Sequence, residues 1–368
     1  MSVDLGATFG VEEEYHLVDP ETCELASRPE LAARAADRAA GPHLHAEMLA
    51  SQLEAATDVC STLEELRAAI VDGRREAQAA AARANATLLA TSTHPFAQLS
   101  ETEVVARPRY AVLVERFGGV VRALNLTGCH VHVSVPDLDT AVAIMNRVRP
   151  YLPLLAAMTA SSPFHEGADT GYASFRLAWL GLWPQGGIPP TVGSADEYRA
   201  LVEQITATGL VGDASELLWE VRPSARFPTL EYRIADVCTD IEDAVLFAAL
   251  TRSLTRTIGA RLDSDEPQSM PPDAVLRAAR WRAARFGMDE QLWSPARGAL
   301  VPANVALDDL ATELDRDLNE HGEQVIVTDL IARLRARGTS AARQRAAFRS
   351  HSDLRRVTGE AVRLTAAQ

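Results

Sequence analysis

Apolar residues at alternate positions lead into the run Gly10–His16 (Gly-Val-Glu-Glu-Glu-Tyr-His), and this alternation predicts a β-strand near the start of the chain. Successive side chains of a strand point to opposite faces. We therefore expect Glu12 and Glu14 to share one face, with His16 next along it, and Glu13 to point to the other face. Two carboxylates on one strand face repel each other unless a cation lies between them. The pattern fits either a solvated strand end or a site for a hard divalent ion such as Mg²⁺.

Further strands, and the helices between them, are predicted from the same kind of pattern. Strand-like runs are expected from Gln52 onward and over Thr87–Ser92, Leu126–Val135, Leu217–Val221 and Thr229–Ala235. Helices are expected over Pro29–Ala40, Thr62–Asn85, Glu101–Leu124, Leu138–Ala160 (interrupted at Pro150 and Pro153), Ser194–Thr206 and Asp240–Leu262. Because one face of each strand carries polar residues, the pattern favours an α+β protein with a largely antiparallel sheet.

The C-terminal quarter of the chain has an almost entirely helical pattern. Its predicted segments are Asp273–Arg285, Leu307–His321 and Gln324–Ala336. A polar, Pro-containing connection, Asp263–Pro272, precedes them. We therefore predict a catalytic sheet-and-helix domain over residues 1–262 and a helical extension over residues 273–368, packed together as one structural unit.

Composition narrows the classes of protein that fit. The chain has 368 residues and a net charge of −14, which disfavours nucleic-acid binding because that function needs a basic surface. No apolar run approaches the roughly 18 residues of a membrane span, and the N-terminus does not resemble a signal peptide. The four cysteines are scattered, without a CxxC motif, as in a reducing compartment. We expect a cytoplasmic protein without a membrane partner.

The sequence contains no lysine, so all 36 basic residues are arginine. A Walker A loop, a pyridoxal phosphate enzyme and a protein kinase each need a particular lysine. These three classes are therefore excluded. If the protein handles a nucleotide, then metal ions, backbone amides and arginines must hold its phosphates.

Polar residues two positions apart occur on most of the predicted strands of the sheet, although not on Thr87–Ser92. The pairs are Glu12 with Glu14, Gln52 with Glu54, His130 with His132, Glu220 with Arg222, and Glu231 with Arg233. Carboxylates with a histidine suit Mg²⁺ or Mn²⁺, whereas arginine forks bind phosphate or carboxylate groups. Such a face suits a metal–nucleotide and an anionic substrate. The two histidines also fit a simpler arrangement in which they hydrogen-bond only within the sheet.

Five motifs in a fixed order resemble those of the glutamate–cysteine ligase type 2 family, the carboxylate–amine ligases. They are Gly-Val-Glu-Glu-Glu at residues 10–14, Glu47 with Ser-Gln-Leu-Glu54, Gly128–Ser134, Trp219–Ser224 and Thr229–Asp236. The resemblance covers roughly Phe9 to Gly287 and includes Thr93–Phe96 and Arg285–Gly287. It implies a fold like the catalytic half of glutamine synthetase, in which a curved, largely antiparallel sheet forms a funnel wrapped by helices.

The resemblance also implies a reaction. A carboxylate, usually the γ-carboxylate of glutamate, attacks the γ-phosphate of ATP, and an amine then displaces phosphate from the acyl phosphate. The implied cofactors are ATP and Mg²⁺, with Mn²⁺ as an alternative. The implied partners are small-molecule substrates, namely glutamate and an amino acid or amine, with cysteine as the default amine. Whether the protein is a homodimer is left open.

The family's site residues carry over by position. The implied metal ligands are Glu12, Glu14, Glu47, Glu54, His130 and Glu231. Arg233 matches an arginine that contacts the transferring phosphoryl group, and Arg222 is placed with it as catalytic. Arg176, Arg222, Arg233, Arg285 and His132 are the implied cofactor-binding residues. Because Glu47 lies an odd number of positions before Glu54, a bulge or a turn must redirect one of them, or Glu47 is not a ligand.

Several alternatives stay open at this point. An acyl phosphate must be shielded from water, and the loop-rich segment Ser161–Gly193, with Trp179 and Trp183, is either a lid or a packed surface loop. The nine arginines between Arg333 and Arg363 are expected to form a solvated helical face, with the alternative that one closes over the phosphates. A ligase for another acid or amine, a phosphotransferase and a non-catalytic binding protein are the competing functions.

Overall fold

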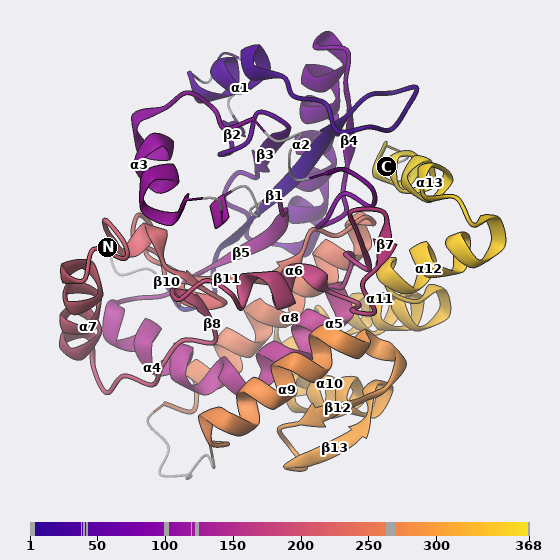
Figure 1. Ribbon diagram of the computed structural model, residues 1–368. Helices are drawn as coiled ribbons and strands as arrows, with labels where there is room; N and C mark the ends of the chain where they lie inside the picture. The colour runs from indigo at the N-terminus through magenta and orange to yellow at the C-terminus, as the bar shows by residue number, and fades with distance from the viewer. Residues whose placement is uncertain are drawn as a thin grey trace.

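The protein is built on a seven-stranded sheet (Figure 1). The computed structural model describes residues 4–366 except 38, 40, 42, 99–102, 119, 122–124 and 263–269. The strands are β1 (Phe9–Val18), β2 (Leu44–Ala46), β3 (Gln52–Ala56), β4 (Thr87–Leu89), β5 (Gly128–Ser134), β10 (Val221–Pro223) and β11 (Thr229–Asp236). Their order is β10-β11-β5-β1-β3-β2, and β4 pairs with the end of β1. All of these pairings are antiparallel, which confirms the predicted sheet.

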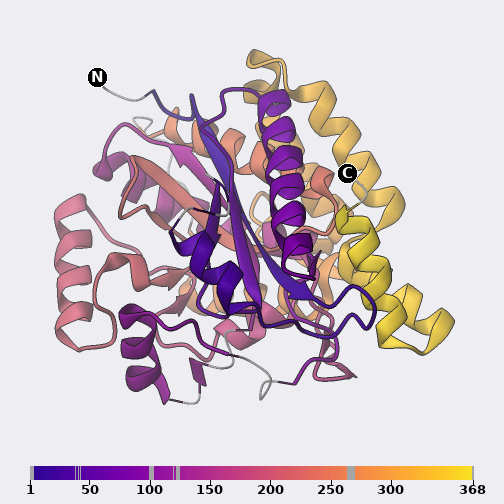
Figure 2. The ribbon, with the colours of Figure 1, turned by 90° about the horizontal axis from the view of Figure 1, so that it is seen from above.

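One face of the sheet is covered by helices α2 (Leu63–Arg83) and α8 (Ile241–Gly259). Figure 2 shows α2 lying along β1. Val11 and Tyr15 of β1 point into this interface and are fully buried, because alternate positions of the strand are apolar. Thr62 begins α2 with a capping box. The opposite face of β1 carries Glu12 and Glu14, so the apolar core fixes which face is left for polar residues.

The remaining helices surround the sheet. They are α1 (Pro29–Ala36), α3 (Pro108–Phe117), α4 (Leu138–Val148), α5 (Leu152–Thr159), α6 (Phe175–Leu180), α7 (Ala195–Ala207), α9 (Asp273–Phe286), α10 (Ala303–Glu320), α11 (Gln324–Arg337), α12 (Ser340–His351) and α13 (Leu354–Ala366). Short strands form three further pairs, β6 (Phe164–His165) with β7 (Ala168–Asp169), β8 (Gly186–Gly187) with β9 (Leu218–Trp219), and β12 (Gln291–Ser294) with β13 (Ala299–Pro302). In the described part of the chain, no helix is long and apolar enough to cross a bilayer.

Most predicted elements are present, and two predictions need correction. The helix expected over Glu101–Leu124 is helical only over Pro108–Phe117 and a short 3₁₀ turn among the residues that are described. Val104 instead forms a β-bridge with Leu49, and Pro108 begins the helix because it cannot donate a hydrogen bond within a preceding turn. The hairpin β12–β13 lies in a region that was predicted to be almost wholly helical.

The C-terminal helices share the core of the sheet domain. Helices α10 and α11 pack on α8, and their leucines belong to the same buried cluster as the strand residues of β5 and β11. Helix α13 packs beside β4, where the Thr365 hydroxyl accepts a hydrogen bond of 3.1 Å from the amide of Ala90. Figure 1 shows α12 and α13, in yellow, at the edge beyond β4.

Candidate active site

Strand pairing brings the predicted polar residues together on one face of the sheet. In the antiparallel registers Glu12 lies opposite His130, Glu14 opposite Glu54, and Glu231 opposite His132. Directly opposed side chains on one face are the closest neighbours across a sheet. The i, i+2 spacing within strands and the register between strands therefore produce a single acidic and histidine-containing surface.

A first cluster is formed by Glu12, His132 and Glu231, which each offer a ligand atom within 4.8 Å of the others. His132 Nε2 lies 3.5 Å from a Glu12 oxygen and 3.9 Å from a Glu231 oxygen. The other ring nitrogen of His132 lies 2.8 Å from the hydroxyl of Thr229, which orients the ring. His132 Nε2 is buried and has no hydrogen-bond partner within the described chain, so it is free to bind a cation.

A second cluster is formed by Glu14, Glu47 and Glu54, whose carboxylate oxygens also lie within 4.8 Å of one another. Glu47 directly follows β2, and a tight turn returns the chain into β3 at Gln52, whose amide donates to the carbonyl of Leu49 at 3.0 Å. This turn redirects Glu47 toward Glu54, as its odd spacing in the sequence required. Glu14 also accepts a hydrogen bond of 2.6 Å from the amide of Gly128.

The two clusters differ in their electrostatics. Burial and the neighbouring Glu14 raise the pKa of Glu47 to about 7, and burial together with Glu12 and Glu47 raises the pKa of Glu54 well above its ordinary value. Burial also acts to raise the pKa of Glu231, but Arg233 and Arg222 hold it well below its ordinary value. Three carboxylates packed without a cation are costly when ionised. The second cluster therefore fits a divalent cation, which would stabilise all three in their charged form.

His130 lies between the two clusters. Its Nδ1 is 3.3 Å from an oxygen of Glu12, and its Nε2 is 3.8 Å from an oxygen of Glu14. Hydrogen bonds from His130 and His132 hold the pKa of Glu12 well below its ordinary value, although burial acts in the opposite direction. His130 thus contacts a carboxylate of each cluster, a position compatible with its predicted role as a ligand.

Arg233 shares the face of Glu231, because the two residues are two positions apart on β11. Its guanidinium contacts the Glu231 carboxylate and lies 3.5 Å from His130 Nδ1, and the register of β11 against β5 shifts between Tyr232 and Ala235. Arg222 lies behind Glu231, since it donates to that carboxylate at 2.9 Å and to the backbone carbonyls of residues 214, 215 and 217. Arg233 is therefore the arginine that faces the clusters, whereas Arg222 orients Glu231.

The other two predicted arginines occupy different places. Arg176 is buried beside Glu14 and donates to the carbonyls of Arg233 and Ile234 at 3.2 Å. A Cβ at Gly128 would lie 2.5 Å from its guanidinium, so only glycine allows this approach. Arg285 lies over the rings of Tyr172 and Phe286, and within the described residues it makes no ion pair with either cluster. Its cofactor-binding role stays a prediction.

The segment Ser161–Gly193 is less irregular than its sequence pattern suggested. It contains β6, β7, α6 and β8, and Trp183 within it is buried. Asp236, at the end of β11, accepts hydrogen bonds of 2.8 Å from the Ser161 amide and from the hydroxyls of Ser162 and Ser174. These bonds fix the start of the segment to the strand that carries Glu231 and Arg233. Its role as a lid stays a prediction.

The sequence pattern does not predict the contacts that four residues of this region make in the structure. Three of them lie inside the family motifs but act through contacts with residues far away in the sequence, namely Gly128, Thr229 and Asp236. The sequence pattern places Glu220 with Arg222 on the polar face, whereas in the structure Glu220 pairs with Arg280 of α9. No spacing rule within one strand could have distinguished these cases.

Comparisons with known proteins agree with this geometry. The family described as Glutamate-cysteine ligase family 2 (GCS2) matches residues 8–360. A protein of Saccharopolyspora erythraea, provisionally named glutamate–cysteine ligase 2-1, is 40% identical over 355 residues, covering 96% of this chain and 93% of its own. A Rhodopirellula baltica protein, provisionally named glutamate–cysteine ligase 2, is 37% identical and covers 96% of this chain and 97% of its own.

Solved structures are similar in fold at low sequence identity. The glutamate–cysteine ligase of Francisella tularensis, solved with AMP, has a TM-score of 0.71 at 12% identity and covers 99% of this chain and 90% of its own. A bifunctional glutathione synthetase from Pasteurella multocida has a TM-score of 0.69 at 16% identity. This chain spans about half of that protein, 52% of its length, and 98% of this chain is covered.

Proposed function

Since the chain belongs to glutamate–cysteine ligase family 2 and is therefore an ATP-dependent carboxylate–amine ligase, we propose that its acid substrate is L-glutamate, acting through the γ-carboxylate. We propose L-cysteine as the amine, with another amino acid or amine as the alternative. The products would be a γ-glutamyl amide, ADP and phosphate. The observation that carries this proposal is the pair of carboxylate clusters with Arg233 beside them on one sheet face.

We propose that the clusters hold Mg²⁺, because carboxylate oxygens and a single imidazole are ligands that this ion accepts. Glu12, His132 and Glu231 would hold one ion and Glu14, Glu47 and Glu54 a second. His130 contacts a carboxylate in each group and would support both. When bound, the ions supply positive charge against the triphosphate.

The proposed reaction has two steps. An oxygen of the γ-carboxylate attacks the γ-phosphorus of ATP, and the bond to the bridging oxygen breaks, which releases ADP. The amine nitrogen then attacks the acyl carbon, phosphate leaves with the bonding electrons, and the nitrogen loses a proton. Arg233, which faces the clusters, would bind the oxygens of the phosphoryl group as it moves. Glu231 is kept ionised by Arg222 and Arg233, which maintains it as a ligand near neutral pH.

An assay of glutamate-dependent ADP release with a panel of amines tests this proposal. We expect release with Mg²⁺ and formation of an amide with at least one amine. The variants Glu14→Gln and Glu231→Gln should lower kcat by about 100-fold or more, because loss of a group that merely orients a metal ligand already costs 10–100-fold. Glu64→Gln, at an exposed position of α2, is the matched control and should retain wild-type turnover.

Two results would count against the proposal. Absence of ADP release with every acid and amine tested, in Mg²⁺ and in Mn²⁺, would contradict ligase activity. A phosphorylated product without any amide would identify a phosphotransferase instead. Wild-type turnover in Glu14→Gln or Glu231→Gln would leave the ligase activity standing but refute the assignment of the metal ligands.

A further inference from the structure

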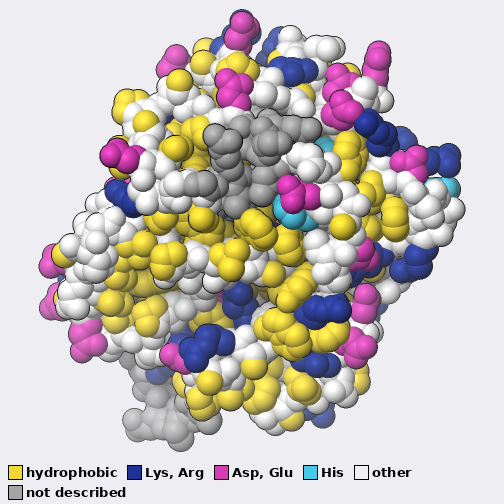
Figure 3. All heavy atoms as spheres, in the orientation of Figure 1, with side chains coloured by type: hydrophobic (Ala, Val, Ile, Leu, Met, Phe, Trp, Pro, Cys, Tyr) yellow, Lys and Arg dark blue, Asp and Glu magenta, His cyan; other side chains and the backbone are white. Residues whose placement is uncertain are grey.

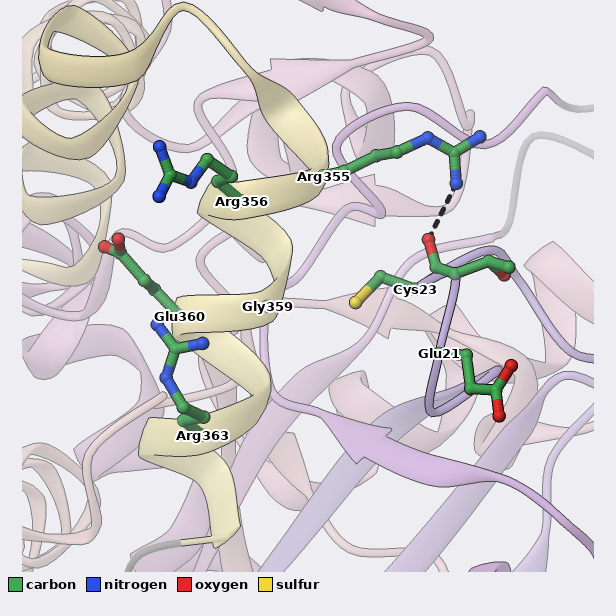
Figure 4. Close-up of a pocket in the computed structure, with 8 residues that line it drawn as sticks. Glu21, Cys23, Arg355, Arg356, Gly359, Glu360 and Arg363 are labelled. Atoms are coloured by element: carbon green, nitrogen blue, oxygen red, sulfur yellow. Dashed lines mark hydrogen bonds between the residues drawn. The ribbon is translucent and has the colours of Figure 1, made fainter.

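A cavity lined by charged residues lies outside the candidate active site, between the turn that follows β1 and helix α13 (Figure 4). Its volume is about 490 Å³, within the range of small-molecule sites. It is lined by Glu21, Thr22, Cys23, Arg355, Arg356, Gly359, Glu360 and Arg363. None of these residues belongs to the carboxylate clusters.

The arginines of α11 to α13 differ in whether they form ion pairs, and this difference distinguishes the cavity. Figure 3 shows arginines gathered along the edge where α12 and α13 lie. Six of the nine arginines between positions 333 and 363 form ion pairs, namely Arg333 with Asp329, Arg335 with Asp308, Arg337 and Arg343 with Asp240 and Asp243, Arg345 with Asp169, and Arg355 with Glu24. Among the described residues, Arg349, Arg356 and Arg363 have no carboxylate within 4.0 Å. Two of these three line the cavity.

Both of these arginines lie on the same side of α13. Arg356 and Arg363 are seven positions apart, which is close to two turns of an α-helix. Among the described residues, the Arg356 guanidinium makes one hydrogen-bond contact, 3.4 Å to the Nδ1 atom of His351. In a chain with 50 acidic and 36 basic residues, two arginines left without a carboxylate beside one cavity are available to a ligand.

The opposite wall of the cavity is already ordered by the protein. The Asp19 carboxylate accepts hydrogen bonds of 2.9 Å from the amides of Glu21 and Thr22. Arg355 donates to the carbonyl of Thr22 at 2.8 Å, the bond drawn in Figure 4, and pairs with Glu24. Protein contacts therefore hold Arg355 in the wall of the cavity, and a ligand would bind to a preformed surface.

The floor of the cavity is at Gly359. A Cβ at this position would lie 3.8 Å from both Arg363 Nη1 and Cys23 Sγ, so the guanidinium and the thiol flank the same point. Figure 4 shows the Cys23 thiol directed toward α13. Cys23 is also the one cysteine that is not buried, since Cys60, Cys129 and Cys238 all are.

We propose that this cavity binds a small molecule through carboxylate or phosphate oxygens, with Arg356 and Arg363 as the groups that contact them. Guanidinium forks match both kinds of oxyanion. Three arginines and two glutamates line the cavity, so its charge suits a ligand with one or two negative groups rather than a polyanion. Because these arginines are exposed, we expect a Kd in about the millimolar range.

Alkylation of Cys23 by neutral iodoacetamide, followed by mass spectrometry of its peptide in the full chain, tests the proposal. The probes are inorganic phosphate and L-glutamate, with sodium chloride at matched ionic strength as the control. A probe at about ten times its Kd should slow alkylation roughly tenfold, because only about one cavity in eleven is then empty. Protection by phosphate alone identifies a phosphoryl ligand, and protection by glutamate alone identifies a carboxylate ligand.

Substitutions decide whether any protection arises in the cavity. Arg356→Gln and Arg363→Gln should each weaken it at least several-fold, whereas Arg349→Gln, an exposed arginine outside the cavity, should leave it unchanged. Protection by neither probe would overturn the proposal. Protection that is equally strong in Arg363→Gln would also overturn it, because the probe would then act from another site. Both arginines lie outside the proposed catalytic groups, so ADP release by these variants without the probe should match the wild type.

Discussion

Glu13 illustrates how much depends on a single position of one strand. It lies between Glu12 and Glu14, yet its carboxylate is buried on the opposite face of β1. There it pairs with Arg74 of α2, with contacts of 2.5 and 2.9 Å, and accepts a hydrogen bond of 2.7 Å from the Tyr15 hydroxyl. The alternation of the strand correctly predicts that Glu13 points away from the clusters. The structure adds that it is a buried structural anion.

We predict that Glu13→Gln lowers the free energy of unfolding by about 3 kcal/mol, because it leaves the buried Arg74 without its counter-charge. Denaturant unfolding followed by circular dichroism measures this change. Turnover per folded molecule should stay at the wild-type level, since the side chain does not reach the polar face. A Glu64→Gln variant on the exposed side of α2 should differ from the wild type by less than about 0.5 kcal/mol. Wild-type stability in Glu13→Gln would contradict this assignment.

The candidate site could be predicted from the sequence where its residues follow strand alternation. Glu12, Glu14, His130, His132 and Glu231 all point to the face that the i, i+2 pattern indicates. Strand alternation predicts the face to which a side chain points, but not the residue with which a long side chain pairs. This is why the pairing of Glu220 with Arg280, and the backbone contacts that hold Arg222, emerge only from the fold.

At the scale of elements, strongly periodic segments were the easiest to predict. Helix α2 and strand β5 combine a clear apolar pattern with clear ends, and both form close to their expected limits. The hairpin β12–β13 consists of four-residue strands, too short for a period to be recognised beside the helices around it. Its turn contains Gly298 at φ +60°, a local signal that short strands do not reinforce.

The contact of His94, in the loop after β4, with the turn after β1 supports a prediction about how stability depends on pH. His94 Nε2 lies 2.9 Å from the carbonyl of Cys23, while its Nδ1 accepts from the amide of Ala97 at 2.9 Å. A second proton on Nδ1 would face this N–H group, so the folded state keeps the ring neutral. Burial lowers the pKa of His94 to about 4, although the Cys23 carbonyl and Glu24 act in the opposite direction. Burial and the neighbouring His94 lower the pKa of His16 to about 3.

We predict that His94 and His16 each lower the stability of the protein as the pH falls from about 6.5 toward 4. This contribution is opposite in sign to that of Glu47 and Glu54, whose raised pKa values make the folded state bind protons in the same window. In this window the unfolded chain binds protons at these histidines and the folded chain does not, so stability is complete above the unfolded pKa. Each buried histidine should account for roughly 2 kcal/mol between pH 7 and pH 5. Urea unfolding of the wild type and of the histidine variants at both pH values isolates this loss as the difference between them. His94→Gln should remove its share of the loss, and His321→Gln, at an exposed site, should not.

At the scale of the whole molecule, the segments on either side of the connection at residues 263–272 share one core. Leucines of α10 and α11 pack with α8 in the cluster that also contains residues of β5 and β11. Arg252 and Arg256 of α8 are buried and pair with Glu323, and Arg256 also pairs with Asp317. A polar connection in the sequence indicates where a chain crosses the surface, but it does not show whether the segments on either side share a core.

We predict that a chain ending at Leu262 does not form a cooperatively folded domain. Truncation would expose the α8 surface that buried leucines of α10 and α11 now cover, each contributing about 1.5–3 kcal/mol, against a typical total stability of about 5–15 kcal/mol. It would also remove Glu323 and Asp317, the counter-charges of Arg252 and Arg256. Thermal unfolding by circular dichroism should show no sharp transition, and co-expression of residues 273–368 should restore one. A truncated chain that unfolds cooperatively and releases ADP would instead show that residues 1–262 fold alone and that the helical extension only adds to a complete domain.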